Sequence, residues 1–110
     1  TCIVRNIDGA AVALRNMKNS GVSSAYVVDE HLRFIGIITL DSAMQVLSGY
    51  TTFDKSILRN VPVIDNLDTP VAEIMPLSAS TPFPLPVIDE NKLFCGIVTK
   101  ASVISSFVTN

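Results

Sequence analysis

The stretch Phe34-Ile35-Gly36-Ile37-Ile38-Thr39-Leu40-Asp41-Ser42 joins a continuously apolar run to a hydroxyl residue and then to a short helical pattern. The same arrangement returns 60 residues later as Phe94-Cys95-Gly96-Ile97-Val98-Thr99-Lys100-Ala101-Ser102. Across residues 27–42 and 87–102, eight of sixteen positions are identical. An internal repeat of this quality indicates one supersecondary unit that is used twice.

Length and composition describe a folded chain with a hydrophobic core. The 110 residues are 48% hydrophobic and 16% charged, which excludes the disordered class. A formal net charge of -2 does not indicate the excess of basic residues that binding to nucleic acid or to an anionic membrane surface requires. No apolar run approaches the roughly 18 residues of a membrane span, so we expect no direct membrane insertion. The N-terminal sequence lacks an initiator Met and a signal-peptide layout, which is typical of an excised piece of a longer protein.

The two cysteines are too few for a disulfide framework. Cys95 lies inside an apolar strand pattern, where the first copy has Ile35, and we predict that it is a core hydrophobe. Neither a CxxC motif nor a His/Cys cluster is present, so no structural metal is predicted. Reduced cysteines of this kind favour a cytoplasmic protein.

The first copy has the periodicity of a helix, two strands and a second helix. We predict a helix over 9–20, with Asp8 as its N-cap and Gly21 as the residue that closes it. The β-branched and apolar runs over 24–28 and 33–38 predict strands, and the pattern over 41–48 predicts a helix. Residues 50–60 have no clear period and predict a connection.

The second copy predicts the same order of elements. A short strand is expected over 61–64, and a helix begins at the Asp68-Thr69-Pro70 signal. Pro76 is predicted to end that helix, which leaves 77–84 irregular. The remaining predicted elements are strands over 85–89 and 93–98 and a helix over 101–108. We therefore divide the chain into a first repeat, 1–58, which includes a short N-terminal strand at Ile3-Val4 and the connecting segment, and a second repeat, 59–110.

The repeated unit resembles the CBS domain, the repeat typified by cystathionine β-synthase. The resemblance rests on Val27-Val28-Asp29, a turn, Gly36-Ile37-Ile38-Thr39 and a following helix, and on their second copy between Leu85 and Phe107. It covers nearly the whole chain. It implies an α/β fold of tandem CBS repeats, in which two helix–strand–strand–helix units are related by a pseudo-twofold axis with two clefts between them.

A narrower resemblance is to the C-terminal CBS pair of the ATP-binding subunit of glycine betaine/proline ABC transporters. It rests on Ile37 to Ser42, Met75-Pro76-Leu77 and Pro86 to Glu90. It implies a cytoplasmic regulatory module at the inner face of the membrane, joined through an ATPase domain to the membrane subunits of a transporter, and a homodimer formed through the CBS modules. The chain contains no G-x-x-x-x-G-K-[ST] loop and no nucleophile–base pair, so we predict that it is not an enzyme.

The resemblance also implies ligand-binding positions. In CBS pairs that bind adenine nucleotides, a Thr or Ser at the end of the second strand and an Asp three residues later hold the ribose. Thr39 and Thr99 match the first position, but Ser42 and Ser102 stand where the family has Asp. A serine accepts from two ribose hydroxyls less well than a carboxylate does.

Backbone at the start of the first strand, here Val22 and Ser23, holds the base in the family. Asp41 stands where many nucleotide-binding copies have a basic residue, and a carboxylate there would repel a phosphate. The second copy has Ala101 at that position and adds Lys100, which favours the second copy as the ligand site.

Each of these positions also has a structural interpretation. Thr39 and Thr99 are good helix N-caps without any ligand. Phe83, among three prolines, forms either a rigid wall for a flat base or only a stiffened start to the next strand. His31 lies in a predicted turn, where a solvated residue is the simplest interpretation and a pH-responsive group is the alternative.

Two functional hypotheses follow. The first is a sensor that requires no cofactor and responds to an adenine nucleotide, to a cyclic dinucleotide such as cyclic di-AMP, or to ionic strength. The second is a ligand-free dimerisation module, which the absence of both ribose-binding Asp residues favours. A CBS regulatory module of another transporter or of an enzyme is a further alternative.

Overall fold

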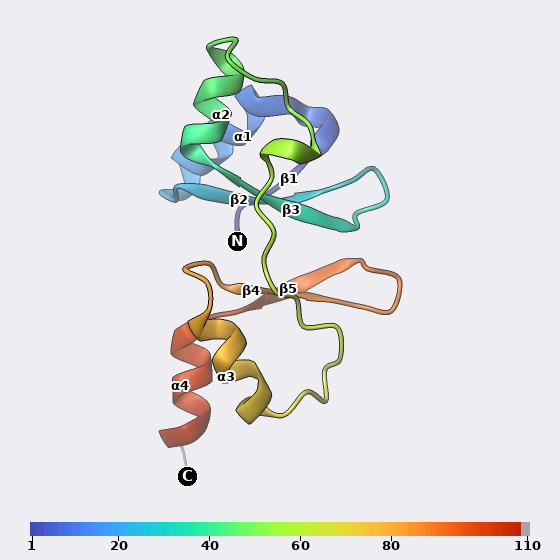
Figure 1. Ribbon diagram of the computed structural model, residues 1–110, viewed down its shortest axis with the longest axis vertical. Coiled ribbons are helices and arrows are strands. Elements are labelled where there is room, and N and C mark those ends of the chain that lie inside the picture. Colours follow the sequence, from blue (N-terminus) through green and yellow to red (C-terminus); the bar gives the residue numbers. More distant parts are fainter. Residues whose placement is uncertain (109–110) are drawn as a thin grey trace. The chain divides into compact units, whose positions relative to one another are not determined.

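The computed structural model describes residues 1–108, so residues 109–110 of the predicted second repeat lie outside the described residues. The chain divides into two units, Thr1–Asn60 and Val61–Asn110, hereafter unit 1 and unit 2. Each unit combines two antiparallel strands with a pair of helices (Figure 1). The predicted mixed α/β class with a repeated unit is confirmed.

Unit 1 contains a three-stranded sheet in the order β1-β2-β3. β1 runs parallel to β2, and β2 pairs antiparallel with β3. The elements in chain order are β1 (Ile3–Arg5), the 3-10 turn η1 (Asn6–Asp8), α1 (Gly9–Ser20), β2 (Ser24–Val28), β3 (Phe34–Thr39), α2 (Leu40–Leu47) and the 3-10 turn η2 (Lys55–Ile57). The predicted elements of the first copy are therefore confirmed to within a residue or two.

The ends of α1 show one correct and one wrong capping prediction. Gly21 closes the helix in the left-handed conformation, at φ 68°, and its N–H donates to the Lys18 carbonyl, as glycine after a helix allows. Asp8 precedes the helix but makes no side-chain cap bond. Its carboxylate instead accepts from the backbone and guanidinium of Arg5 at 3.4 Å, because η1 turns the chain before α1 begins.

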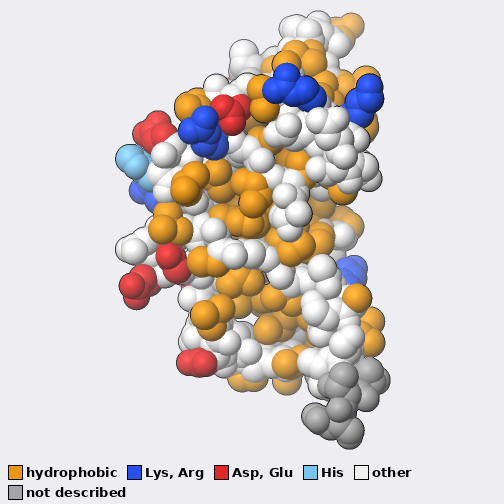
Figure 2. Space-filling view, turned by 180° about the vertical axis from the view of Figure 1, so that it is seen from behind, with side chains coloured by type: hydrophobic (Ala, Val, Ile, Leu, Met, Phe, Trp, Pro, Cys, Tyr) orange, Lys and Arg blue, Asp and Glu red, His pale blue; other side chains and the backbone are white. Residues whose placement is uncertain are grey.

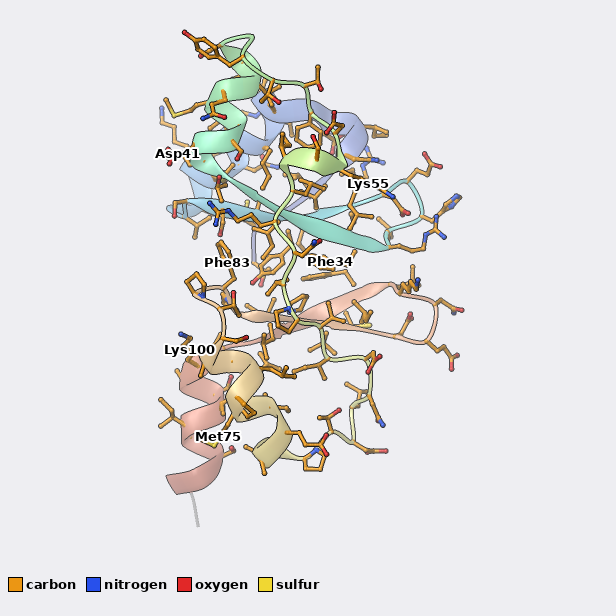
Figure 3. The ribbon with its side chains drawn as sticks, in the orientation of Figure 1. Phe34, Asp41, Lys55, Met75, Phe83 and Lys100 are labelled. Atoms are coloured by element: carbon orange, nitrogen blue, oxygen red, sulfur yellow. The ribbon has the colours of Figure 1, made fainter. Side chains whose placement is uncertain are left out.

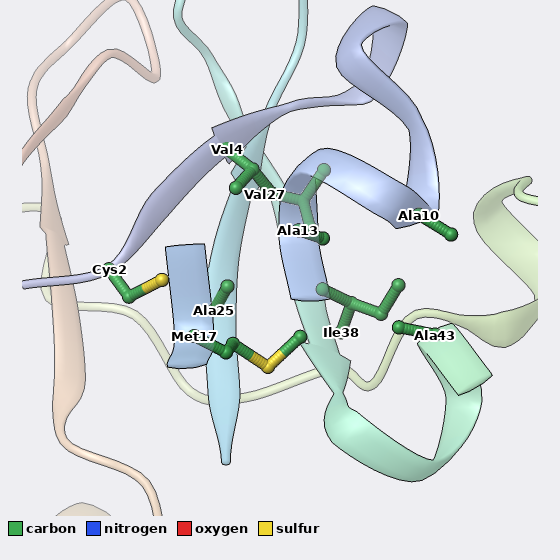
Figure 4. Packing of buried hydrophobic residues seen from close by; sticks show 9 residues of the cluster. All are labelled: Cys2, Val4, Ala10, Ala13, Met17, Ala25, Val27, Ile38 and Ala43. Carbon is green, nitrogen blue, oxygen red and sulfur yellow. The ribbon is translucent and has the colours of Figure 1, made fainter. Parts of the chain in front are cut away.

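The core of unit 1 lies between the sheet and the helices α1 and α2. Small and medium apolar side chains fill it: Cys2, Val4, Ala10, Ala13, Met17, Ala25, Val27, Ile38 and Ala43 (Figure 4). Alanines on both helices let α1 and α2 pack against each other. Burial raises the pKa of the Cys2 thiol, which keeps it in the neutral form that a core accepts.

Residues 51–60, which we call the connector, fold back onto β3. Ile37 and Arg59 exchange two backbone hydrogen bonds of 3.0 and 2.7 Å. Gly36 permits this approach, because a Cβ at that position would lie 2.8 Å from the Leu58 Cβ. Gly36 also has a φ of +151°, which side chains rarely adopt. The connecting segment, for which no regular structure was predicted, therefore pairs with β3.

The described part of unit 2 has a two-stranded sheet, whereas unit 1 has a three-stranded one. Unit 2 comprises α3 (Val71–Ala79), β4 (Leu85–Ile88), β5 (Phe94–Val98) and α4 (Lys100–Val108), with β4 and β5 antiparallel. The predicted strand over 61–64 is wrong, since Ile64 alone makes a parallel bridge, to Val87. Pro62 offers no N–H for a ladder. The buried core consists of Ile64, Leu85 and Val87, with partly buried neighbours from α3.

The prediction that Pro76 ends its helix is also wrong, because α3 continues to Ala79. Proline lacks an N–H but keeps its carbonyl, which accepts from Ser80 N at 3.2 Å. Apolar contacts of Ile74 and Leu77 with the core hold both halves of the helix in place. Pro70 is the N-cap residue of α3, so the predicted capping role of Asp68 is wrong. The Asp68 N–H donates to the Asn66 side chain.

Cys95 is exposed, which corrects the prediction that it is a core residue. In unit 1 the equivalent Ile35 packs against the core together with Phe53 and Leu58 of the connector. In the described part of unit 2, Gly96 has no atom within 4 Å of a Cβ built on it, so no segment takes the connector's place beside β5.

Candidate functional site

The junction between β3 and α2 brings together two of the predicted ligand-binding hydroxyls. Thr39 is the N-cap of α2. Its Oγ1 accepts from the Ser42 backbone N–H at 3.2 Å and donates to Ser42 Oγ at 3.1 Å. The capping interpretation of Thr39 is therefore confirmed. Ser42 Oγ donates to no acceptor among the described residues, so its proton remains available to another partner.

The start of β2 reaches the same junction through backbone. The Ser23 carbonyl accepts from the Leu40 N–H at 2.8 Å, which occupies the first amide of α2. Val22, beside it, is 44% exposed. Asp41 lies exposed in the first turn of α2 (Figure 3). Its negative charge complements the positive end of the helix and opposes the approach of another anion.

The junction between β5 and α4 repeats the hydroxyl pair in a more closed form. Ser102 N–H donates to Thr99 Oγ1 at 3.1 Å, and Thr99 N–H donates to Ser102 Oγ at 3.1 Å. The two hydroxyl oxygens lie 2.8 Å apart, and Ser102 Oγ also donates to the Thr99 carbonyl at 2.9 Å. Thr99 thus caps α4, and a ligand would have to replace part of this network.

The first amide of α4 differs from that of α2. By the repeat, Lys100 and Phe83 match Leu40 and Ser23, yet the Lys100 N–H donates to no acceptor among the described residues. The Lys100 side chain is exposed at the same helix end (Figure 3). An unpaired amide and an ammonium group at a helix N-terminus form the combination that favours an anion.

Phe83 lies half-buried in the segment ahead of β4 (Figure 3). Its backbone N–H donates to Thr81 Oγ1 at 3.2 Å, so a local turn as well as three prolines fixes this segment. Both the base-wall and the stiffening interpretations of Phe83 stay predictions.

Two open grooves lie beside the helix pairs. A groove of about 680 Å³ in unit 1 is lined by Leu14, Arg15, Met17, Lys18, Gly21, Val22, Leu40 and Met44. A groove of about 300 Å³ in unit 2 is lined by Met75, Ser78, Ala79, Lys100, Val103 and Ile104. Val22 and Lys100 are the only predicted site residues among them. Apolar residues at exposed helix positions could have indicated these two grooves from the sequence, but the prediction did not use them.

An aspartate side chain accepts backbone hydrogen bonds in the turn of each hairpin, Asp29 in unit 1 and Asp89 in unit 2. In unit 1, Asp29 Oδ1 accepts from the backbone N–H groups of His31 and Arg33 at 2.8 and 3.0 Å. Partial desolvation raises the pKa of Asp29, but these bonds and the Arg33 guanidinium outweigh it and hold the pKa below its usual value. His31 is exposed in this turn, which agrees with its interpretation as a solvated residue.

Comparisons with known proteins identify the repeat. Residues 3–49 match the CBS domain family. A CBS domain pair/ACT domain protein from Thermotoga maritima superposes with a TM-score of 0.75 at 16% identity, over 97% of this chain and 88% of that one. The first repeat thus matches the CBS domain family, and the chain as a whole has the fold of a CBS domain pair. The recognition made from the repeated Gly-Ile-Ile/Val-Thr motif is therefore confirmed.

The CBS pair is also similar to transporter components. It is 35% identical over 104 residues to the glycine betaine/carnitine transport ATP-binding protein GbuA of Listeria monocytogenes, covering 94% of this chain and 26% of GbuA. It superposes on Staphylococcus aureus OpuCA with a TM-score of 0.80 at 16% identity, over 96% of this chain and 90% of that one. The chain thus spans about a quarter of the length of the curated relatives that it matches.

Several solved CBS pairs with this fold hold adenosine-containing ligands. They are complexes of CBSX2 with AMP, of CbpB with c-di-AMP, and of the MJ0100 domain pair with 5-methylthioadenosine and S-adenosyl-L-methionine. In the described residues of the present chain, no group of three or more potential ligands could hold a metal ion. No described helix is long and apolar enough to cross a membrane.

Proposed function

We propose that this CBS pair is the regulatory module of the ATP-binding subunit of an osmoprotectant ABC transporter, and that it acts in the cytoplasm by binding an adenine nucleotide or a cyclic dinucleotide. The observation that carries the proposal is the N-terminal end of α4. This end of the helix carries the Lys100 ammonium group, the unpaired backbone N–H of Lys100, and the hydroxyl groups of Thr99 and Ser102. Similarity to GbuA supports the transporter context.

The chemistry of this end of α4 suits a nucleotide. The Lys100 amide and ammonium groups would bind a phosphate, and the hydroxyls of Thr99 and Ser102 would bind the ribose. Serine in place of the family's aspartate weakens the ribose contact. We therefore expect phosphate contacts to contribute more of the affinity than they do where a carboxylate is present.

Regulation follows if the ligand binds one arrangement of the transporter more tightly than another. A coupling of about 1–3 kcal/mol is typical of allostery and is enough to change transport several-fold. Ionic strength is a second input of the same module, because added salt shortens the screening length around exposed charges such as Lys100 and Asp41. The membrane subunits of the transporter would receive this signal through the ATPase domain.

A thermal-shift panel tests the proposal. The chain is mixed with ATP, ADP, AMP and cyclic di-AMP, and with a salt series as a separate arm. A ligand at 100 times its dissociation constant adds about 2.7 kcal/mol of stability, which is a readily measured shift. Lys100→Gln should remove most of the nucleotide shift, whereas Lys92→Gln, an exposed lysine in the unit 2 hairpin, should leave it unchanged. Flat traces for all four nucleotides would contradict ligand sensing.

A second candidate function is dimerisation without a ligand. Large apolar side chains are exposed on the helices of both units, including Met44 at 53% and Ile104 at 62%, and hydrophobic side chains reach the surface shown in Figure 2. Exposed apolar area of this kind is typical of an interaction surface. We propose a second copy of the chain as its partner.

Sedimentation equilibrium tests the dimer. Met44→Glu and Ile104→Glu should each shift the chain toward the monomer, because each places a charge in an apolar contact. Leu67→Glu is the matched control, since Leu67 is 87% exposed and lies outside the helices. Dissociation by all three variants alike, or a monomeric wild-type chain, would contradict this arrangement.

A further inference from the structure

The outer edge of β3, which faces away from β2, is covered by the connector. Tyr26 of β2 lies opposite Ile37 of β3, and its N–H donates to the Cys2 carbonyl at 2.9 Å, on the side away from β3. Opposite residues of an antiparallel ladder either bond to each other or both point outward, so the Ile37 N–H and carbonyl point away from β2. There Arg59 exchanges its two hydrogen bonds with Ile37 (Figure 1).

The corresponding edge of β5 has the same hydrogen-bonding geometry. Pro86 of β4 lies opposite Ile97 of β5, and the Pro86 carbonyl accepts from the Ile64 N–H at 2.9 Å, on the side away from β5. By the same alternation, the Ile97 N–H and carbonyl point out of the outer edge of β5. No described residue bonds to either group across that edge. A donor and an acceptor are therefore open in the register at which the connector binds β3.

The side chains beside this edge are uncovered as well. A Cβ built on Gly96 has no atom within 4 Å, whereas one built on the equivalent Gly36 lies 2.8 Å from the Leu58 Cβ. Cys95 is exposed, whereas the equivalent Ile35 packs against the core of unit 1. A strand edge with open backbone groups is a template for pairing with another strand. The edge of β5 lacks both the backbone partner and the aliphatic side chain that the connector supplies to β3.

A second copy of the chain does not supply these two features. Its β5 would place Gly96 before Ile97, whereas the connector places Leu58 before its pairing residue Arg59. Its connector is already bonded to its own β3. The edge is also only five residues long, Phe94–Val98, against the roughly 20–30 residues a side of a stable protein interface. Its size and chemistry suit a single peptide segment.

We propose that the outer edge of β5 binds one extended segment of a partner protein by strand addition. The segment runs antiparallel to β5, as the connector runs to β3, and exchanges two backbone hydrogen bonds with Ile97. It carries an aliphatic residue immediately before the pairing residue, and this side chain packs on Gly96 as Leu58 packs on Gly36. Recognition therefore depends on backbone groups and one aliphatic side chain.

A synthetic peptide with the sequence of residues 53–60, acetylated and amidated at its ends, tests the edge in trans. NMR spectra of the chain follow the amide signals during the titration. The peptide should bind with a dissociation constant on the order of 1 mM, because the cost of ordering it offsets most of its contacts. It should shift the Ile97 amide signal and slow its hydrogen exchange. The Ile37 amide is the internal control, since its own connector already covers it.

Two methylated peptides test the hydrogen bonds. A methyl group on the Arg59 nitrogen of the peptide removes the donor to the Ile97 carbonyl and should weaken binding at least fivefold. The same group on the Asn60 nitrogen is the matched control, because successive N–H groups of an extended segment point to opposite edges, and it should have little effect. A peptide with Leu58→Gly lacks the aliphatic side chain and should bind about tenfold more weakly.

A pair of protein variants locates the site. Gly96→Val places a side chain in the space that the aliphatic residue of the segment would fill, so it should weaken the peptide at least tenfold. Ala101→Val adds a valine at an exposed position of α4 and is the matched control, which should leave the affinity unchanged.

Four results would overturn the proposal. They are equal affinities of the two methylated peptides, undiminished binding to Gly96→Val, signal changes at Ile37 in place of Ile97, and protection of the Ile97 amide by raised protein concentration alone. The last result would assign the edge to a second copy of the chain. The methylated peptides keep the test decisive if Gly96→Val does not fold. Because no nucleotide is used, the outcome is independent of the α4 site.

Discussion

Unit 1 and unit 2 share half of a sixteen-residue motif, yet they bury it to different extents. In unit 1 the strand β1 pairs with β2, and the connector bonds to β3. In the described part of unit 2, the edge of β4 that does not face β5 pairs only through the single bridge between Ile64 and Val87. Nothing lies within 4 Å of a Cβ built on Gly96. The repeated motif encodes the hairpin and the capped helix, whereas the segments outside the motif determine how much core forms around them.

This comparison predicts that unit 1 is the more stable half. Its core cluster spans residues from three strands and two helices, while the buried cluster described in unit 2 consists of Ile64, Leu85 and Val87. Stability in proteins varies by region, and hydrogen exchange reads it region by region. Three pairs of substitutions, each with one member in either unit, test that difference, and a fourth prediction concerns the connector of unit 1.

The largest effect is expected in the core of unit 1. Met17 of α1 is fully buried, so Met17→Ala should lower the free energy of unfolding by about 3 kcal/mol through lost contacts and a cavity. Leu77 of α3 is partly buried, and Leu77→Ala should cost about half as much. Hydrogen exchange of amides in each unit measures both. A larger loss from Leu77→Ala would reverse the proposed order of stability.

The two strand glycines sharpen the comparison. Gly36→Ala should destabilise unit 1 by about 2 kcal/mol, because its Cβ would lie 2.8 Å from the Leu58 Cβ at a strained φ of +151°. Gly96→Ala should change stability by less than about 0.5 kcal/mol, since nothing lies within 4 Å of its Cβ. Urea denaturation of the two variants measures the difference. Equal losses of unfolding free energy in the two variants would mean that the connector does not pack closely against β3 at Gly36.

Much of the local structure could be predicted from the sequence. The hairpins, the helix caps at Thr39 and Thr99 and the left-handed Gly21 each depend on residues within a few positions of one another. Local hydrogen bonding and backbone preference decide such features, so the pattern of residue types is sufficient.

The errors arose where distant residues decide the outcome. Cys95 has the apolar context of a core residue, but its burial depends on whether another segment covers β5. Pro76 has the character of a helix breaker, but the contacts of Ile74 and Leu77 keep α3 intact across it. The open edge of β5 showed no motif, since only the folding of the connector onto β3 distinguishes the covered edge from the open one.

The paired helix caps give a smaller effect. Thr39→Ala and Thr99→Ala should each cost about 1 kcal/mol without ligand, because each removes the acceptor of a Ser N–H in the first helical turn. Thr→Ser at either position should restore most of the loss. Thermal denaturation measures the four variants. If Thr99→Ala abolishes a nucleotide-induced shift that Thr39→Ala leaves intact, the two junctions differ in function as well as in hydrogen bonding.

The smallest effect concerns the cap of the connector. Side-chain hydrogen bonds from Ser56 and Thr52, and the backbone N–H of Ser56, hold the pKa of Asp54 below its usual value. A carboxyl with a lower pKa in the folded state contributes stability that is present above its unfolded-state pKa of about 3.9 and is lost as the pH falls through the folded-state value. The melting temperature of the wild-type chain should therefore fall as the pH decreases below about 4.

Asp54→Asn tests this contribution, because an amide does not titrate in that range. The variant should be less stable than wild type at pH 6, and the two melting curves should converge as the solution is acidified. Ser56→Ala keeps the carboxylate but removes its largest hydrogen-bonding partner, so it should show part of the same convergence. Parallel curves for wild type and Asp54→Asn from pH 6 to about 2.5 would mean that this cap does not hold the connector on unit 1.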